Sequence, residues 1–136
     1  MTPILAFDIE TVPDVNGIRL LYDLPASLPD EEVVLFAQQK RRAQNGSDFM
    51  QHHLHQVVAI SCCMRWGQDK IHVGTIGEMH DSEEEMIAKF FDLIESHTPQ
   101  LVSWNGGGFD LPVLHYRALI HGIAAARYWD MGEGDF

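Results

Sequence analysis

Short runs of apolar residues alternate along the chain with longer segments in which apolar positions recur every three or four residues. The short runs are typical of buried strands and the periodic segments of amphipathic helices. The pattern predicts strands at residues 4–7, 57–66, 70–76 and 101–104. It predicts helices at residues 31–44, 83–96 and 111–121, and an irregular loop across residues 12–29. Ser82 and Glu85 have the spacing of a capping box at the start of the second of these helices. The order of the elements indicates an α/β fold.

Two acidic residues, Asp8 and Glu10, follow the apolar run at residues 4–7. Side chains alternate between the faces of a strand, so both carboxylates lie on one face, roughly 7 Å apart along the chain. Like charges at this spacing repel, so either one of the carboxylates is protonated or a divalent cation such as Mg²⁺ or Mn²⁺ lies between them. The alternative is that Glu10 already lies outside the strand in solvent, while Asp8 accepts hydrogen bonds at the strand end. A metal site needs a third acidic group.

A third acidic residue, Asp110, follows the glycine-rich segment 105–109 and opens the last predicted helix. Taken alone, Asp110 is typical of an ordinary helix N-cap, and the glycines before it of a plain turn from strand to helix. The order of the elements adds a second interpretation, because sites in open α/β sheets gather at the carboxyl ends of strands. If the first and fourth predicted strands are neighbours, Asp8, Glu10 and Asp110 converge at one point. There they could hold one or two divalent cations.

The composition narrows the classes of function. The 136 residues, 46% of them hydrophobic, suit one domain with a real core, and no apolar run is long enough to span a membrane. The net charge of −11 counts against a protein that coats nucleic acid, but it is compatible with local contacts at a metal site. The adjacent Cys62 and Cys63 are poor disulfide partners, which favours a reducing, cytoplasmic location. The cluster of His52, His53 and His55 indicates a flexible or substrate-facing loop in preference to a zinc site.

The two acidic motifs resemble those of DEDD-type 3′–5′ exonucleases. Phe7-Asp8-Ile9-Glu10-Thr11 resembles the first motif of that family, and Asn105-x-x-x-Phe109-Asp110 resembles the second. The sequences of residues 55–61 and 104–112 are similar to those of predicted bacterial exonucleases related to the proofreading domain of family B DNA polymerases. The resemblance implies an RNase H-like fold, with a mixed sheet flanked by helices, and hydrolysis of phosphodiester bonds with two Mg²⁺ or Mn²⁺ ions. It also implies site residues: Asp8, Glu10 and Asp110 as catalytic metal ligands, and Thr11, Asn105 and Phe109 as contacts to the 3′ end of a single-stranded nucleic acid.

One motif of the family has no counterpart in this sequence. The third motif, Tyr-x-x-x-Asp or His-x-x-x-x-Asp on a later helix, supplies a fourth carboxylate, and nothing after Asp110 matches it. We therefore expect residues 1–136 to be the N-terminal portion of a single RNase H-like exonuclease domain, weak or inactive by itself. Asp130 and Asp135 are the candidate replacements for the fourth carboxylate. An unfinished sheet exposes an edge, which predicts self-association.

Two other functions stay open. A non-catalytic RNase H-like module that binds nucleic acid or protein would agree with the negative charge and the absent third motif. In that case, replacing Asp8 changes only the stability of the fold. A metal-dependent phosphoesterase acting on a small nucleotide is the other alternative, and its products from oligonucleotides and mononucleotides would distinguish it.

Overall fold

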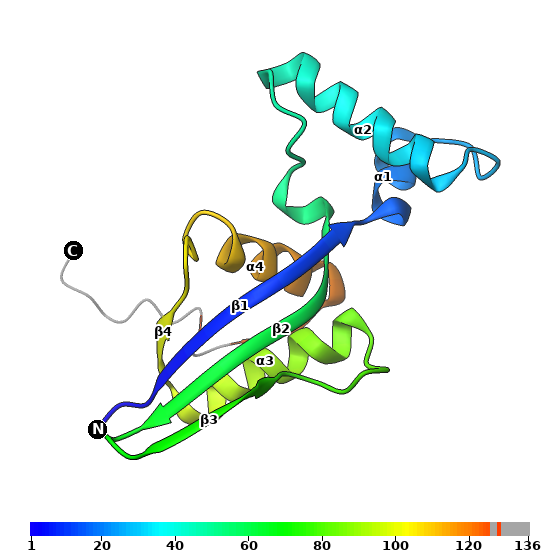
Figure 1. The fold of residues 1–136 in the computed structure, drawn as a ribbon. Helices are drawn as coiled ribbons and strands as arrows, with labels where there is room; N and C mark the ends of the chain where they lie inside the picture. Colours follow the sequence, from blue (N-terminus) through cyan, green and yellow to red (C-terminus); the bar gives the residue numbers. More distant parts are fainter. Residues whose placement is uncertain (126–127, 129–136) are drawn as a thin grey trace. The chain divides into compact units, whose positions relative to one another are not determined.

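One mixed sheet joins strands from both halves of the sequence. In the computed structural model, which describes residues 1–125 and 128, this sheet has four strands in the order β3-β2-β1-β4 (Figure 1). The strands are β1 (Ile4–Pro13), β2 (His55–Trp66), β3 (Lys70–Thr75) and β4 (Gln100–Val102). β4 runs parallel to β1 with Leu5 opposite Leu101, and β3 runs antiparallel to β2 with Cys63 opposite Val73. The first and fourth strands are neighbours, which is the condition on which the convergence of the three acidic residues depended.

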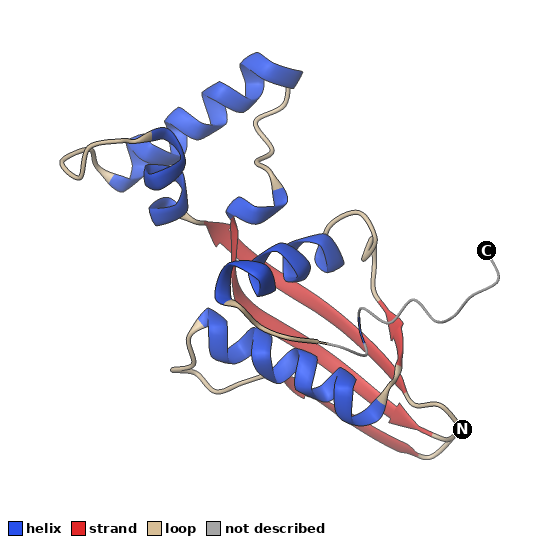
Figure 2. Ribbon diagram, turned by 180° about the vertical axis from the view of Figure 1, so that it is seen from behind, coloured by secondary structure: helices blue, strands red, loops and turns tan. Residues whose placement is uncertain are grey.

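The chain divides into two compact units. Unit 1 consists of Met1–Glu10 and Val57–Phe136, and unit 2 consists of Thr11–Gln56. In unit 1, α3 (Glu83–His97) and α4 (Asp110–His121) lie on the same face of the sheet, as Figure 2 shows. Unit 2 contains α1 (Val15–Tyr22), α2 (Asp30–Asn45) and the short 3-10 helix η1 (His52–Leu54).

Each unit has a hydrophobic core of its own. In unit 1, the buried Leu5, Phe7 and Ile9 of β1 belong to a core that includes Phe90 and Phe91 of α3. In unit 2, the core consists of Ile18, Val33, Ala37, Met50 and Leu54. Alternate residues of β1 therefore pack into the core of unit 1, and the residues between them are left for other roles.

The three predicted helices are confirmed as α2, α3 and α4, and the capping box of Ser82 and Glu85 is present at the start of α3. The prediction of an irregular loop across residues 12–29 was wrong, because β1 continues to Pro13 and α1 follows it. Asp14 caps α1 by accepting a hydrogen bond from the Gly17 N–H at 3.0 Å, and Ile18 packs fully buried in the core of unit 2. Tertiary packing therefore stabilises a helix that residue propensities disfavour.

The histidine-rich segment is also more ordered than predicted. The residues from His52 to His55, which we expected in a loop, form η1 and the first residue of β2. Leu54 is buried in the core of unit 2, and His55 is only 9% exposed. Burial of these two side chains explains why a polar stretch adopts regular structure.

The outer strand β3 leaves apolar side chains in contact with solvent. Ile71 and Val73 are 59% and 74% exposed. An edge of this kind can pair with another chain, and self-association stays a prediction. None of the helices in the described part of the chain is long and apolar enough to cross a membrane.

Candidate active site

The acidic residues of β1 lie on the opposite face of the strand from its core residues. Asp8 and Glu10 are exposed, whereas Phe7 and Ile9, which alternate with them, are buried. The prediction that the two carboxylates share a face is in agreement with this pattern. The alternative in which Glu10 lies outside the strand was wrong, because β1 extends three residues beyond it to Pro13.

Asp110 lies beside β1 because β4 is short. β4 pairs only with Ile4–Ala6, so β1 continues past its neighbour with backbone groups available on that side. The carboxylate of Asp110 accepts hydrogen bonds from the backbone N–H of Ile9 and from Ser103 Oγ, the latter at 3.1 Å. Ser103 had been predicted as part of the fourth strand, but that strand ends at Val102, and the hydroxyl of Ser103 reaches the acid.

The environment of Asp110 disfavours its charged form. Asp110 is 4% exposed, and burial raises the pKa of its carboxyl group above the ordinary value, with the nearby charge of Asp8 raising the pKa further. The hydrogen bonds from Ser103 and Ile9 act in the opposite direction. A buried carboxyl group whose pKa is raised by a neighbouring acidic residue marks a place where a cation would stabilise the negative charge.

Asp110 is not the cap of its own helix. The N-cap position of α4 is Phe109, which makes no side-chain capping hydrogen bond, and Asp110 is the first residue of the helix. The interpretation of Asp110 as an ordinary N-cap was therefore wrong. Its side chain is directed instead to Ser103 and to β1.

The glycine-rich loop before α4 has no room for a side chain at two of its three glycines. A Cβ atom at Gly106 would lie 2.7 Å from Cβ of Ser103, and one at Gly108 would lie 2.5 Å from Oδ1 of Asn105. At Gly107 nothing lies within 4 Å. Asn105 itself has a positive φ of 53°, and its carbonyl oxygen accepts hydrogen bonds from the N–H groups of Gly108 and Phe109. Asn105 therefore has the ordinary role of a turn residue. Its carbonyl oxygen also fixes Gly108 and Phe109, the two residues that precede Asp110.

A buried ionic network holds α4 against α3 and β2. Arg117 of α4 forms an ion pair with Glu83 of α3, and the two side chains are each 5% exposed. The Glu83 carboxylate also accepts hydrogen bonds from the backbone N–H of Val57 and from His121 Nε2. Since Asp110 begins the same helix, this network also positions the candidate acid.

Thr11 belongs to unit 2, where it contacts a buried histidine. Its Oγ lies 3.2 Å from His55 Nδ1, and His55 Nε2 lies 3.2 Å from the carbonyl oxygen of Met50. His55 had not been predicted as a site residue. Its polar surroundings in the sequence offered no signal of the contact, which joins residues 44 positions apart.

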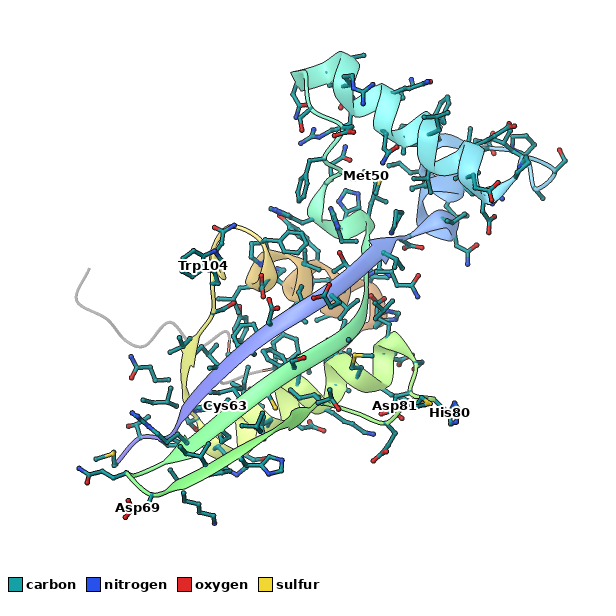
Figure 3. The ribbon with its side chains drawn as sticks, viewed as in Figure 1. Met50, Cys63, Asp69, His80, Asp81 and Trp104 are labelled. Carbon is teal, nitrogen blue, oxygen red and sulfur yellow. The ribbon has the colours of Figure 1, made fainter. Side chains whose placement is uncertain are left out.

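Two aromatic residues flank the loop before α4. Phe109 is partly buried and packs against the core of unit 1, which is its ordinary structural role. Trp104 is 93% exposed on the loop that leads from β4 to α4 (Figure 3). Trp104 had been predicted at the end of the fourth strand. Because β4 already ends at Val102, the side chain of Trp104 lies on an exposed loop, which the sequence did not reveal.

Two hollows lie on unit 1 near these residues. One, of about 620 Å³, is lined by Asp8 together with residues of β1, β2 and β3, among them Ala6, Cys63 and Val73. The other, of about 330 Å³, is lined by Gly107, Leu111, Pro112, His115, Tyr116 and Tyr128. Both volumes fall in or near the range of small-ligand pockets, and the second directly adjoins the start of α4.

The donor atoms fit a hard divalent cation. The three predicted ligands supply carboxylate oxygens, which Mg²⁺ and Mn²⁺ prefer. Within residues 1–125 and 128, no three histidine, cysteine or acidic side chains are grouped so that they could hold a metal ion. The structure thus brings Asp8 and Asp110 together, and the convergence of Glu10 with them stays a prediction. Asp130 and Asp135 lie outside the described residues.

Comparisons of the sequence with known proteins identify a family to which this chain is similar. Residues 47–136 match the family described as predicted 3′–5′ exonucleases related to the exonuclease domain of PolB. DNA polymerase 1 of Sulfolobus acidocaldarius is 40% identical over 42 residues, which cover 31% of this chain and 5% of that protein. DNA polymerase 1 of Sulfurisphaera ohwakuensis is 46% identical over 44 residues, which cover 32% of this chain and 5% of that protein. The matched stretch is thus a small fraction of each polymerase.

The fold comparison extends over most of the chain. The family B DNA polymerase of the hyperthermophilic archaeon Pyrobaculum calidifontis superposes with a TM-score of 0.50 and 21% identity, covering 92% of this chain and 12% of the polymerase. This likeness confirms the predicted α/β fold with a mixed sheet flanked by helices. The family match covers more than half of the sequence, and the chain belongs to the predicted 3′–5′ exonucleases related to the exonuclease domain of family B DNA polymerases.

Proposed function

We propose that this chain hydrolyses phosphodiester bonds at the 3′ end of a single-stranded nucleic acid with two bound Mg²⁺ or Mn²⁺ ions, weakly because its motifs supply three carboxylates and not four, and that residues 1–136 belong to a single exonuclease domain. The observation that carries the proposal is the Asp110 carboxylate. It is buried at the start of α4 and accepts hydrogen bonds from Ser103 and the Ile9 N–H, and its pKa is raised by burial and, to a smaller extent, by the adjacent Asp8. A cation between the two acids removes the repulsion that raises this pKa.

Asp8, Glu10 and Asp110 would hold the ions. When bound, the ions supply an activated water molecule and neutralise the negative charge that develops on the leaving 3′ oxygen. The chain's own part is to fix the ligands: Ser103 and the Ile9 N–H orient the Asp110 carboxylate, and the Arg117–Glu83 ion pair holds the helix that carries it. The products are a nucleoside 5′-monophosphate and a strand shortened by one nucleotide with a new 3′-hydroxyl.

The substrate contacts proposed here are Thr11, Asn105 and Phe109. Thr11 directly follows Glu10 in the first acidic motif, and its proposed contact with the 3′ end rests on that place in the motif. Asn105 and Phe109 belong to the loop before Asp110. The exposed Trp104 adds an aromatic surface on which a base can stack, a contact that tolerates any sequence.

A second function, a non-catalytic module that binds nucleic acid or protein, is favoured by one observation. In the described part of the chain, no group of three acidic, histidine or cysteine side chains is arranged to hold a metal ion. In this case the substitution Asp8→Ala relieves repulsion with Asp110 and stabilises the fold slightly, and metal ions have no effect on either variant.

The decisive experiment is a time course of cleavage of a 5′-labelled single-stranded oligonucleotide in Mn²⁺. We expect a ladder of products that shorten by one nucleotide from the 3′ end, and we expect Asp8→Ala to abolish it. Asp69→Ala is the matched control, because Asp69 is an exposed acid at the turn between β2 and β3 (Figure 3) and its loss changes the net charge equally. DNA and RNA oligonucleotides of one sequence identify the preferred substrate.

Thermal melts of the same variants report on the metal site independently of cleavage. Mn²⁺ at about 100 times its Kd stabilises a folded protein by about 2.7 kcal/mol, and this gain should disappear in Asp8→Ala but persist in Asp69→Ala. Cleavage that survives in Asp8→Ala, or an Mn²⁺ effect that is equal in all three proteins, would refute the proposed site. If Mn²⁺ leaves the Tm of every variant unchanged and no cleavage occurs, the results would favour the non-catalytic module.

A further inference from the structure

One edge of the sheet combines exposed apolar side chains with unprotected backbone groups. β3 is the outermost strand, next to β2 (Figure 1), and its Ile71 and Val73 are 59% and 74% exposed. Proteins commonly protect such an edge with proline, with a β-bulge or with several charged side chains. β3 has no proline, Lys70 is its only charged residue, and its six residues pair with β2 without a bulge. The edge is therefore open to pairing with another strand.

The register between β3 and β2 shows which backbone groups of β3 face this edge. The Ile76 N–H donates to the carbonyl oxygen of Ile60 at 2.8 Å, and residues 70–75 continue in the same register along residues 61–66. In an antiparallel pair, residues that hydrogen-bond to the neighbouring strand alternate with residues whose N–H and C=O groups point away from it. Counting back from residue 76, the outward-pointing residues are Ile71, Val73 and Thr75.

These outward-pointing residues are self-complementary about Val73. If a second copy of the chain pairs antiparallel with β3, only outward-pointing residues can form the hydrogen-bonded pairs. A two-fold axis at Val73 pairs this residue with itself and pairs Ile71 with Thr75, so that all three take part. All three are β-branched, which favours strand structure and cross-strand contacts. On the other face of the strand, His72 lies opposite Gly74, which has no side chain.

The charge on β3 also agrees with antiparallel pairing. Lys70 is the first residue of the strand and carries its only charge. Antiparallel pairing about Val73 places the lysines of the two copies at opposite ends of the paired strands, roughly 20 Å apart. Parallel pairing would place them side by side, where like charges are destabilising.

We propose that this protein forms a symmetric dimer in which the β3 strands of two copies pair antiparallel about Val73. The two sheets then become one continuous sheet. Val73 of each copy lines the hollow of about 620 Å³ that Asp8 and Cys63 also line, so the two hollows adjoin at the two-fold axis on one face of this sheet. The two Asp8 residues lie on that face about five interstrand spacings apart, roughly 24 Å. The dimer does not depend on the proposed function, because each copy keeps its own acidic residues.

Sedimentation equilibrium of the full chain tests for the dimer. A single pair of strands is a small interface, so we expect the mean mass to rise from monomer toward dimer between roughly 10 µM and 1 mM. Val73→Lys places two like charges opposite one another at the axis and should raise the Kd at least about tenfold. Leu119→Lys is the matched control, because Leu119 is an apolar residue of α4 that is 61% exposed, and it should leave the Kd unchanged.

Two results of this experiment would overturn the proposal. The first is a chain that stays monomeric over the whole concentration range. The second is a dimer whose Kd is the same in Val73→Lys as in the unaltered chain, which would mean that another surface, such as the edge of β4 or the outer face of α4, forms the contact.

Complementary charges separate direct pairing at Val73 from an indirect effect of the substitution. Val73→Glu should weaken the dimer as Val73→Lys does, whereas an equimolar mixture of the two variants should form a heterodimer, because opposite charges then meet at the axis. Circular dichroism checks that both variants are folded, as the 74% exposure of Val73 leads us to expect. A mixture of folded variants that stays monomeric would show that Val73 does not face itself and would overturn the proposed register.

Amide hydrogen exchange measured by NMR reads the register without any substitution. The N–H groups of His72 and Gly74 bond to β2, so their exchange should not depend on protein concentration. At a concentration where about nine-tenths of the chain is dimeric, exchange at Ile71, Val73 and Thr75 should slow roughly tenfold, because only the remaining monomer exchanges there. Exchange that is independent of concentration at these three residues, while the mass shows a dimer, would overturn the proposal.

Discussion

Replacing Glu83 by glutamine should destabilise unit 1 strongly, because the substitution removes the charge that compensates Arg117 in a buried position. The two side chains are each 5% exposed. Arg117 Nε lies 3.0 Å from both carboxylate oxygens of Glu83, and Arg117 Nη2 donates to Glu83 Oε1 as well. Glutamine keeps one oxygen that can accept from the Val57 N–H, but its amide nitrogen cannot accept from Arg117 or His121, so the substitution removes hydrogen bonds together with the charge.

The expected size follows from the burial of the pair. Removing one partner of a buried ion pair costs about 3–5 kcal/mol, a large share of the roughly 5–15 kcal/mol that stabilises a typical domain. For 136 residues, an unfolding entropy of about 2.1 cal/mol/K per residue converts this loss into a fall in Tm of roughly 10–17 °C. The substitution should also make the position of Asp110 less well fixed, because Arg117 anchors the helix that begins at Asp110.

Urea and thermal unfolding followed by circular dichroism measure the effect. Glu84→Gln is the matched control, because Glu84 is exposed in the same first turn of α3 and its loss changes the helix-dipole interaction by no more than about 1 kcal/mol. The double variant Glu83→Gln/Arg117→Met removes both charges and should be at least about 2 kcal/mol more stable than the sum of the single losses predicts. If Glu83→Gln and Glu84→Gln unfold at the same urea concentration, the reasoning about the buried pair is wrong.

Three further predictions concern the loop, the buried acid and the buried histidine. Gly106→Ala and Gly108→Ala should each lower the free energy of unfolding by about 1–3 kcal/mol, whereas Gly107→Ala should leave the Tm unchanged; equal melts for all three variants would contradict the steric argument. Asp110→Asn should raise the free energy of unfolding at pH 7 while it abolishes cleavage. The folded state raises the pKa of this carboxyl group, so its ionised form opposes folding above that pKa, and the gain should shrink in urea titrations at pH 4. Burial lowers the pKa of His55 in the folded state below its ordinary value of 6.5, so the unfolded chain binds more protons. The free energy of unfolding should therefore fall as the pH drops below about 6.5. An equally steep fall in His55→Asn would show that another group is responsible.

The elements with strong periodicity could be predicted from the sequence. α3 presents Met86, Phe90 and Ile94 at helical spacing behind a capping box, so its location follows from local pattern alone. The proximity of Asp8 and Asp110 could be predicted only on the condition that β1 and β4 are neighbours, because sites gather at the carboxyl ends of strands but the sequence does not fix the strand order.

Contacts between distant residues could not be predicted in this way. α1 contains Gly17 and is only eight residues long, and it depends on the burial of Ile18 in a core that the sequence does not display. Glu83 looked like one of three acids that favour a helix N-terminus, and only the fold shows that it is the buried one. Ser103 looked like the end of a strand, but the early end of β4 frees its hydroxyl for Asp110.

The separate core of unit 2 has a consequence for the order of folding. β1 and β2 are neighbours in the sheet, yet the residues at their junction with unit 2, Thr11 and His55, are 44 positions apart in the chain. Closing an unstructured loop of that length costs about 3 kcal/mol in entropy before any strand contact compensates it. If the compact helical segment forms first, it brings these two residues within hydrogen-bonding distance and sets the register between the strands. The slow, long-range step of sheet assembly then becomes a fast, local one, so mutations in the helical core should slow the folding of the whole sheet.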